Sequence, residues 1–208
     1  LASTVTPGTI SYTGATLSAS SDSPFASSGS VTFTGNVTDT IKILGPNNGG
    51  TNGFQFGTGA FTIEFWIKTT AQAGWIYSNA ANGTGINISV GLSGTTGSGY
   101  DGKIEFNEQV GGSTSGHTFT SSVVNDGQWH HVAMSRVANG SATYCFLDGV
   151  LQGSHGGTNN LNTPEDIFIG RYQSGAGYAL NGQLSNFRVT AAALYTSPFT
   201  PPTSPLTQ

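Results

Sequence analysis

The sequence predicts an all-β protein, folded as an antiparallel sandwich or barrel. Three observations support this prediction: many short runs in which apolar and polar residues alternate, connections rich in glycine and asparagine, and no segment with the periodicity of a substantial helix. Evenly spaced short strands with such connections are typical of sandwiches and barrels. The length of 208 residues suits one β domain with some additional chain.

The N-terminal residues 1–28 are dominated by Ser, Thr, Ala and Gly, which predicts an arm or linker with one or two marginal strands at most. Beyond it we expect one β domain over residues 29–208, ending in a Pro-rich tail. The clearest strand is FTIEFWIKTT, in which apolar residues recur at every second position. Glu64 and Lys68 share the other face of this strand, so Lys68 is a candidate partner for Glu64.

Further strands are expected from runs of the same kind: INISVGL, KIEFNE, WHHVAMSR, TYCFLDG and DIFIGRY. Asp148-Gly149 has the residue types of a tight hairpin turn, because glycine tolerates a positive φ. Asp126-Gly127 predicts a similar turn that leads into WHHVAMSR. In GQLSNFRVT the apolar spacing does not fit a plain strand, which predicts a bulge near Ser185-Asn186.

Composition narrows the classes of function. Only 8% of the residues are charged, so the surface is polar through hydroxyl and amide groups, which favours a protein exposed outside a cell. The six basic residues are scattered singly, and we expect no nucleic-acid partner. No apolar run approaches the roughly 20 residues of a membrane span. The single cysteine, Cys145, is expected to be a buried and inert thiol.

Five segments, taken in order, resemble a laminin G-like domain: FGTGAFTIEFWIKT, DGQWHHVAMSR, YCFLDGVLQG, IFIGRY and LNGQLSNFRVT. The resemblance covers about residues 30–195. It implies a jelly-roll sandwich of the concanavalin A-like superfamily, with two antiparallel sheets of roughly six or seven strands. The ending ALYTSPFTPPTSPL is similar to that of such domains in bacteriophage virion proteins, especially tail, fibre and capsid-surface proteins.

Two adjacent histidines, His130 and His131, raise the question of a metal or proton-transfer site. Neighbours in a strand face opposite sides of the sheet, so these two side chains cannot bind one ion together. We therefore predict a structural role, in which Trp129 packs between the layers and one imidazole is buried and hydrogen-bonded.

Enzymatic activity is not expected, although several glycoside hydrolases share this sandwich. They need two carboxylates on one face, placed on either side of the scissile bond. Asp101 and Glu105 share strand parity but are separated by a turn, whereas Glu105 and Glu108 face opposite sides. No catalytic residues and no cofactor are predicted; a structural calcium ion is considered as an alternative to a role of the loop acids in turns and caps.

The resemblance implies that calcium could bind at the rim of the sandwich, through carboxylates and backbone carbonyls. The loop acids available for it are Asp39, Asp101, Asp126 and Asp166. Ligand contacts are expected on two rim loops, GTTGSGYDG and RYQSGAGYAL, where tyrosine rings offer flat surfaces for sugars. The candidate ligand-binding residues are Tyr100, Asp101, Tyr172 and Tyr178.

The function expected from these observations is that of a non-enzymatic structural or adhesive protein on the surface of a phage virion or of an extracellular assembly. Its partners would be other subunits, onto which the N-terminal arm docks by adding a strand, and a cell-surface glycan. The alternative is a carbohydrate-binding, lectin-like module of a larger secreted bacterial protein.

Overall fold

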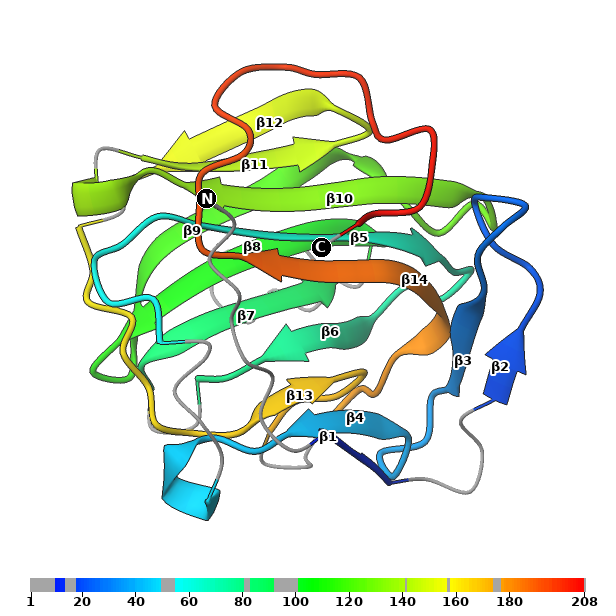
Figure 1. Ribbon diagram of the computed structural model, residues 1–208, viewed down its shortest axis with the longest axis horizontal. Coiled ribbons are helices and arrows are strands. Elements are labelled where there is room, and N and C mark those ends of the chain that lie inside the picture. The colour runs from blue at the N-terminus through cyan, green and yellow to red at the C-terminus, as the bar shows by residue number, and fades with distance from the viewer. Residues whose placement is uncertain are drawn as a thin grey trace.

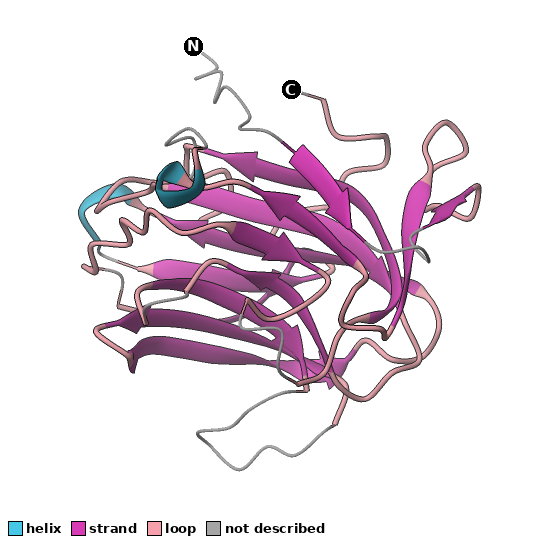
Figure 2. Cartoon of the chain, turned by 90° about the horizontal axis from the view of Figure 1, so that it is seen from below, coloured by secondary structure: helices cyan, strands magenta, loops and turns pink. Residues whose placement is uncertain are grey.

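A computed structural model of the chain describes residues 10–13, 18–49, 55–80, 83–91, 101–140, 142–156, 158–173 and 177–207. In these residues two seven-stranded antiparallel sheets pack face to face, which confirms the expected all-β jelly-roll sandwich (Figures 1 and 2). Helical structure in this part of the chain is limited to two single turns, η1 (Pro46–Asn48) and η2 (Ala138–Gly140). None of its helices has the length and apolar character needed to cross a membrane.

Sheet A has the strand order β1-β4-β13-β6-β7-β8-β9. Its strands are β1 (Ile10–Thr13), β4 (Thr40–Ile43), β13 (Ile167–Ile169), β6 (Gly74–Ser78), β7 (Gly85–Val90), β8 (Lys103–Val110) and β9 (Ser113–Val123).

Sheet B has the order β12-β11-β10-β5-β14-β3-β2. Its strands are β12 (Val150–His155), β11 (Thr143–Leu147), β10 (Trp129–Arg136), β5 (Phe61–Lys68), β14 (Asn181–Thr190), β3 (Ser30–Thr34) and β2 (Ser18–Ser20).

The hydrophobic core lies between the two sheets and follows the alternation in the sequence. In β5 the residues Phe61, Ile63, Phe65 and Ile67 face inward and are fully buried. The ring of Phe65 stacks on Phe187 of β14, with ring centroids 5.4 Å apart. Tyr77 of β6 reaches the same Phe187 ring from sheet A, at 6.1 Å. Each large apolar side chain buried in this way stabilises the fold by roughly 1.5–3 kcal/mol, so the alternation fixes which face of each strand points inward.

The predicted turns and the predicted bulge are confirmed. Asp148 and Gly149 both have positive φ, 50° and 76°, and join β11 to β12 as a tight hairpin. Gly127, with φ 76°, turns the chain into β10. The register of β14 against β5 shifts between Ser185 and Arg188, where Asn186 has φ 50°.

The described parts of residues 1–28 add strands to the chain's own sheets. β1 pairs with β4 in sheet A, and β2 pairs with β3 in sheet B. The docking of this arm onto a neighbouring subunit stays a prediction, as does the boundary at residue 28.

Residues 191–207 form a C-terminal strap that crosses the outer face of sheet B, in red in Figure 1. The strap is held by hydrogen bonds rather than by a further strand. The backbone N–H of Phe199 donates to the carbonyl of Gly149 at 3.0 Å, and the N–H of Tyr195 donates to the hydroxyl of Ser135 at 3.2 Å. The Pro-rich tail expected from the sequence is therefore part of the packed domain.

Candidate functional site

A buried ionic network lies on the outer face of sheet B, beneath the C-terminal strap. Oε1 of Glu64 accepts hydrogen bonds from Nε and Nη2 of Arg188 at 2.9 and 2.6 Å. Its Oε2 accepts one from the hydroxyl of Tyr195 at 2.9 Å and lies 3.2 Å from Nε2 of His131. Burial alone would raise the pKa of Glu64, but the bonds from His131 and Arg188 outweigh it, and the pKa is lowered.

This network brings an acid and an imidazole together, but in a closed place. The side chains of Glu64 and His131 are both 0% exposed. The rings of Tyr195 and Phe199 stack at 3.7 Å in the strap, and Phe199 lies 5.7 Å from the imidazole of His131. A reacting molecule has no access to this carboxylate, so we assign the network to holding the strap on sheet B.

Two expectations for this face are wrong. Lys68 does not pair with Glu64, because its Nζ lies 2.7 Å from Oδ2 of Asp22 in the arm. Trp129 does not pack between the layers: its Nε1 donates to Oδ1 of Asp22 at 3.1 Å, and it lies opposite Lys68 in the β10–β5 register. Lys68 and Trp129 occupy strand positions that alternate with the buried ones, so both face outward, where Asp22 bonds to both.

The two neighbouring histidines have separate partners, as strand geometry predicts. His131 is buried in the network with Glu64, which confirms one buried imidazole. Nδ1 of His130 lies 2.7 Å from Oδ2 of Asp148, and its Nε2 lies 3.1 Å from Oδ1 of Asp126. Hydrogen bonding to Asp148, with a further contribution from Asp126, raises the pKa of His130.

Each of the four aspartates considered for calcium has partners within the chain. The side chain of Asp39 accepts two bonds from Thr34, and Asp101 pairs with Lys103 at 3.2 Å. Asp126 contacts His130, whereas Asp166 pairs with Lys42 at 2.6 Å and accepts the N–H of Gly45. In the described ranges no three acids, histidines or cysteines are grouped for a metal. Calcium needs several oxygens turned to one ion, and a structural calcium site at these residues stays a prediction.

The glutamates within the strands lie on three different surfaces. Glu64 is under the strap, and Glu105 lies on the outer face of sheet A, 2.8 Å from Nε2 of His117. Glu108 faces inward, where it accepts hydrogen bonds from Thr143 at 2.6 Å and from Asn159 at 3.1 Å. Glu105 and Glu108 point to opposite sides of β8, which confirms the prediction made from their spacing in the strand.

An aromatic rim lies at the end of the sandwich where β6 and β8 begin; we use this name for Trp75, Tyr172 and Tyr178. The rings of Trp75 and Tyr172 pack at 4.7 Å with an interplanar angle of 37°. The backbone N–H of Trp75 donates to the backbone carbonyl of Tyr178. Tyr178 itself is 51% exposed. Trp75 lies opposite Ser89 in the register, which places it on the outer face of sheet A.

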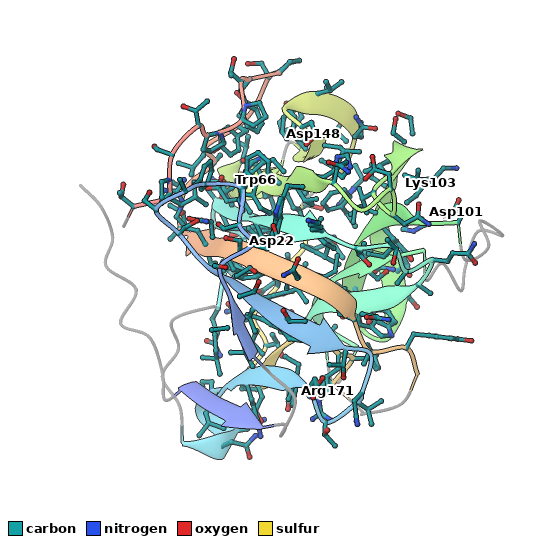
Figure 3. All side chains as sticks on the ribbon, turned by 90° about the vertical axis from the view of Figure 1, so that its right-hand side faces the viewer. Asp22, Trp66, Asp101, Lys103, Asp148 and Arg171 are labelled. Carbon is teal, nitrogen blue, oxygen red and sulfur yellow. The ribbon has the colours of Figure 1, made fainter. Side chains whose placement is uncertain are left out.

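Three of the four predicted ligand residues belong to this end of the molecule. Tyr172 and Tyr178 are part of the rim. Asp101 lies beside it, since the N–H of Gly102 donates to the carbonyl of Gln72 in the segment that precedes β6. Tyr100 lies outside the described residues. Figure 3 faces this end and shows Asp101 and Arg171 on it.

A band of polar side chains crosses the outer face of sheet A from β6 to β9. One cross-strand row contains Ser78, Asn87, Asn107 and His117, and Glu105 lies in the next row, opposite Ser89. Nδ2 of Asn87 and Oδ1 of Asn107 are buried and have no hydrogen-bond partner within the described structure. Donors and acceptors thus lie on the same face as Trp75.

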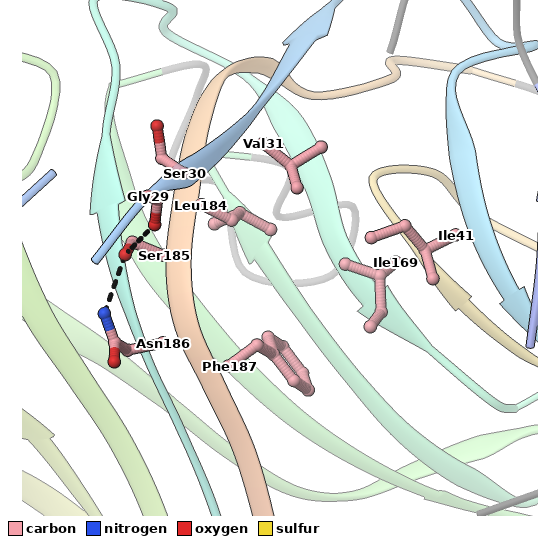
Figure 4. Close-up of a pocket in the computed structure, with 9 residues that line it drawn as sticks. All are labelled: Gly29, Ser30, Val31, Ile41, Ile169, Leu184, Ser185, Asn186 and Phe187. Atoms are coloured by element: carbon pink, nitrogen blue, oxygen red, sulfur yellow. Dashed lines mark hydrogen bonds between the residues drawn. The ribbon is translucent and has the colours of Figure 1, made fainter. Parts of the chain in front are cut away.

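A crevice of about 210 Å³ opens at the side of the sandwich, between β3 and β14 on one side and β4 and β13 on the other (Figure 4). Its walls are mainly apolar, with Val31, Ile41 and Phe187 among them. The polar groups at its end bond to the protein itself: Ser185 donates to the carbonyl of Gly29 at 2.7 Å. We attribute the crevice to incomplete packing between the sheets.

Sequence reasoning missed Trp75, the polar band and Arg171. Trp75 precedes an irregular pairing of β6, so alternation alone does not place it. The sequence does indicate the polar band, because polar residues fill the positions between the apolar residues of INISV and KIEFNE. These polar residues are Asn87, Ser89, Glu105 and Asn107.

Comparison with known proteins agrees with this architecture. The family model Laminin_G_3, described as the concanavalin A-like lectin/glucanases superfamily, matches residues 39–197. A search of curated proteins found no match.

Solved structures of similar fold include the binding domain of Paraclostridial Mosquitocidal Protein 1, with 13% identity and a TM-score of 0.67, covering 90% of this chain and 45% of that one. Domain 4 of AbnA, a GH43 extracellular arabinanase from Geobacillus stearothermophilus in complex with arabinotriose, has 18% identity, a TM-score of 0.61 and coverages of 91% and 84%. Domains LG4-5 of the mouse laminin alpha1 chain have 14% identity, a TM-score of 0.51 and coverages of 65% and 36%.

The chain thus spans less than half the length of the mosquitocidal and laminin structures. At these identities the likeness concerns the fold.

Proposed function

Because the chain belongs to the concanavalin A-like lectin/glucanase superfamily, we propose that it is a non-catalytic, lectin-like module that binds a glycan at its aromatic rim. The observation that carries the proposal is the Trp75–Tyr172 pair beside the exposed Tyr178. Aromatic faces at the edge of a sheet suit the apolar faces of sugar rings, and nearby polar groups suit their hydroxyls. The arabinanase domain of similar fold, described in complex with arabinotriose, supports the proposal.

The arrangement of the acids supports the absence of catalysis. Glycoside hydrolysis requires two carboxyl groups that face the same bond. Glu64, Glu105 and Glu108 lie on three surfaces, and each is engaged by donors or an imidazole of the chain itself. The module would act outside a cell, as its low charge and its amide- and hydroxyl-rich composition favour.

The proposal is tested by titrating the protein with oligosaccharides selected on a glycan array. We expect Trp75→Ala to weaken binding about tenfold or more, because the sugar loses an aromatic face. Trp129→Ala is the matched control, since Trp129 lies at a different surface and bonds to Asp22. If Trp75→Ala retains its fold, seen in its thermal unfolding, and binds glycan as well as the parent does, the rim is not the site.

A second candidate function is a subunit of a virion or of another extracellular assembly. Exposed valines favour it: Val123 of β9 and Val150 of β12 are 42% and 59% exposed where these edge strands meet through Ser121 and Gln152. An apolar edge of this kind suits contact with a second subunit. Sedimentation of the isolated chain distinguishes the two candidates, since an assembly subunit self-associates and Val150→Asp prevents it.

A further inference from the structure

Within the described structure, Arg171 is the basic side chain that has neither an ion pair nor a full set of hydrogen bonds. Four of the six basic residues form ion pairs with carboxylates, namely Lys42, Lys68, Lys103 and Arg188. Arg136 is buried and donates to three backbone carbonyls, those of Gly57, Gly59 and Asn159. In the described structure Arg171 has one hydrogen bond, from Nη1 to the carbonyl of Val37, and it is long at 3.4 Å.

The guanidinium group of Arg171 is nevertheless held in a defined position. Its central carbon lies 4.6 Å from the centroid of the Phe168 ring, a distance at which a cation is attracted to the ring face. Phe168 lies opposite Ser78 in the register, which places its ring on the outer face of sheet A, as Trp75 is. An arginine stacked on an aromatic ring keeps its planar fork oriented for a ligand.

In the part of this loop that the structure describes, two buried polar atoms have no hydrogen-bond partner. Nε of Arg171 is buried without an acceptor, and Oε1 of Gln173 is buried without a donor. A buried polar group without a partner is unfavourable, and such groups are uncommon in folded proteins. Arginine stays protonated, so the guanidinium group of Arg171 keeps its positive charge and would be stabilised by a bound anion. Desolvation by burial lowers the pKa of Arg171, which agrees with the missing counter-charge.

Among the described residues, no carboxylate forms an ion pair with Arg171. The acids near this part of sheet A are Asp166, which is paired with Lys42, and Asp39, which bonds to Thr34. The Nζ of Lys42 lies 5.5 Å from the centroid of the same Phe168 ring, but its charge is paired with Asp166. Among the described residues, Arg171 is thus the cation of this corner that forms no ion pair.

We propose that the aromatic rim binds an acidic glycan, one that carries a carboxylate or a sulfate, with Arg171 as the residue that pairs with the anionic group. The inference rests on the proposed function, because it specifies the ligand of the same site. Tyr172, the next residue, packs against Trp75 with tilted rings, so the sugar ring and its acidic substituent would be held by neighbouring side chains. Guanidinium forks match carboxylate and sulfate oxygens with two parallel hydrogen bonds.

The test compares each acidic oligosaccharide with its neutral counterpart by calorimetry. The probes are an oligouronide, the same oligouronide with its carboxyl groups reduced to alcohols, a sulfated oligosaccharide and its desulfated form. For the parent protein we expect the acidic member of at least one pair to bind about ten- to hundredfold tighter, the range of a charge-assisted hydrogen bond. The pair that shows the difference identifies the anionic group.

The variant Arg171→Gln should lose this preference and keep the weaker binding of the neutral sugar. Arg171→Lys keeps the positive charge but lacks the planar guanidinium group, so its preference for the acidic sugar should be intermediate between those of the parent and of Arg171→Gln. The matched control is Lys103→Gln, which removes the same charge at the same end of the molecule but from a residue paired with Asp101. It should leave the preference intact. Thermal unfolding of each variant establishes that it is folded, and the salt dependence of the parent's binding provides a second readout.

Equal binding of the acidic and neutral members of both pairs by the parent protein would overturn the inference and leave the proposed function standing. Loss of the preference in Lys103→Gln as well as in Arg171→Gln would also overturn it, because the effect would then be one of net charge. Absence of binding to any probe, together with no hit on the glycan array, would instead refute the proposed function itself.

Discussion

At the scale of single residues, the polar side chains of this protein work in small groups that each join distant parts of the chain. His130 joins the β11–β12 hairpin to the turn before β10 through Asp148 and Asp126. Glu64 joins β14 and the C-terminal strap to β5. Such contacts are charge-assisted, so their contributions to the free energy of unfolding depend on protonation.

Stability should fall as the pH rises through neutrality because of His130. Its pKa is raised in the folded protein above the ordinary value of 6.5. A raised pKa gives stability that is fully present below the unfolded value and lost as the pH rises through the folded value. We expect His130→Gln to cost less than about 1 kcal/mol at about pH 5.5, because the group is partly exposed, and to cost nothing at about pH 8.5. Urea unfolding at both pH values measures this.

If the difference between parent and variant is the same at both pH values, the two carboxylates do not act on His130 as a charged group. Asp126→Asn should reduce the pH dependence only in part, since Asp148 contributes more to the shift in the pKa of His130.

Replacing Glu64 should be among the most damaging polar changes. Glu64→Gln leaves Arg188 without its counter-charge beneath the strap, and we expect the free energy of unfolding to fall by about 3 kcal/mol. Lys68→Gln is the control on the same strand and face; it breaks an exposed ion pair with Asp22 and should cost less than about 1 kcal/mol. Equal losses in urea unfolding would contradict the structural role of the network.

At the scale of elements, the strands follow from alternation, whereas the partners of their outward residues do not. The inward face of β5 could be predicted because its aliphatic and phenylalanine residues follow the two-residue period, at Phe61, Ile63, Phe65 and Ile67. The hairpin at Asp148-Gly149 could be predicted because its turn chemistry is local. The partner of Glu64 could not, because Arg188 and Tyr195 are more than a hundred residues away in the sequence.

The candidate site was predictable only in part, for the same reason. Tyr172 and Tyr178 could be singled out because they lie in a glycine-rich loop, where ligand contacts are common. Trp75 comes from another element, and its packing against Tyr172 depends on how β6 and β13 are ordered in sheet A. Trp129 was misplaced because its partner, Asp22, belongs to an arm whose pattern predicts little structure.

The C-terminal strap makes a prediction at this scale. Gly149 has φ +76°, and a Cβ there would overlap the carbonyl oxygen of Phe199 in the strap. Gly112 has φ +81°, but a Cβ there would meet nothing. Both alanine variants have the same backbone strain of about 1–2 kcal/mol, so Gly149→Ala should cost about 1–3 kcal/mol more than Gly112→Ala through overpacking. Equal costs in urea unfolding would show that the strap does not press on the hairpin.

At the scale of the whole molecule, the two outer faces of the sandwich differ in kind. The outer face of sheet B is covered by the C-terminal strap, whose aromatic rings pack over His131 and Phe146. The outer face of sheet A carries the polar band, the aromatic rim and the unpaired Arg171. The contacts on the outer face of sheet B therefore stabilise the fold. We assign the proposed recognition of a glycan to the outer face of sheet A.

The central claim, that a glycan binds on the sheet A side at the aromatic rim, is tested most directly by amide hydrogen exchange with and without a saturating oligosaccharide. We predict slower exchange in residues 72–78 and 168–173, and no change in β5, β10 or the strap. Slower exchange confined to β5, β10 and the strap would contradict the account, because the ligand would then bind on the face that we describe as closed.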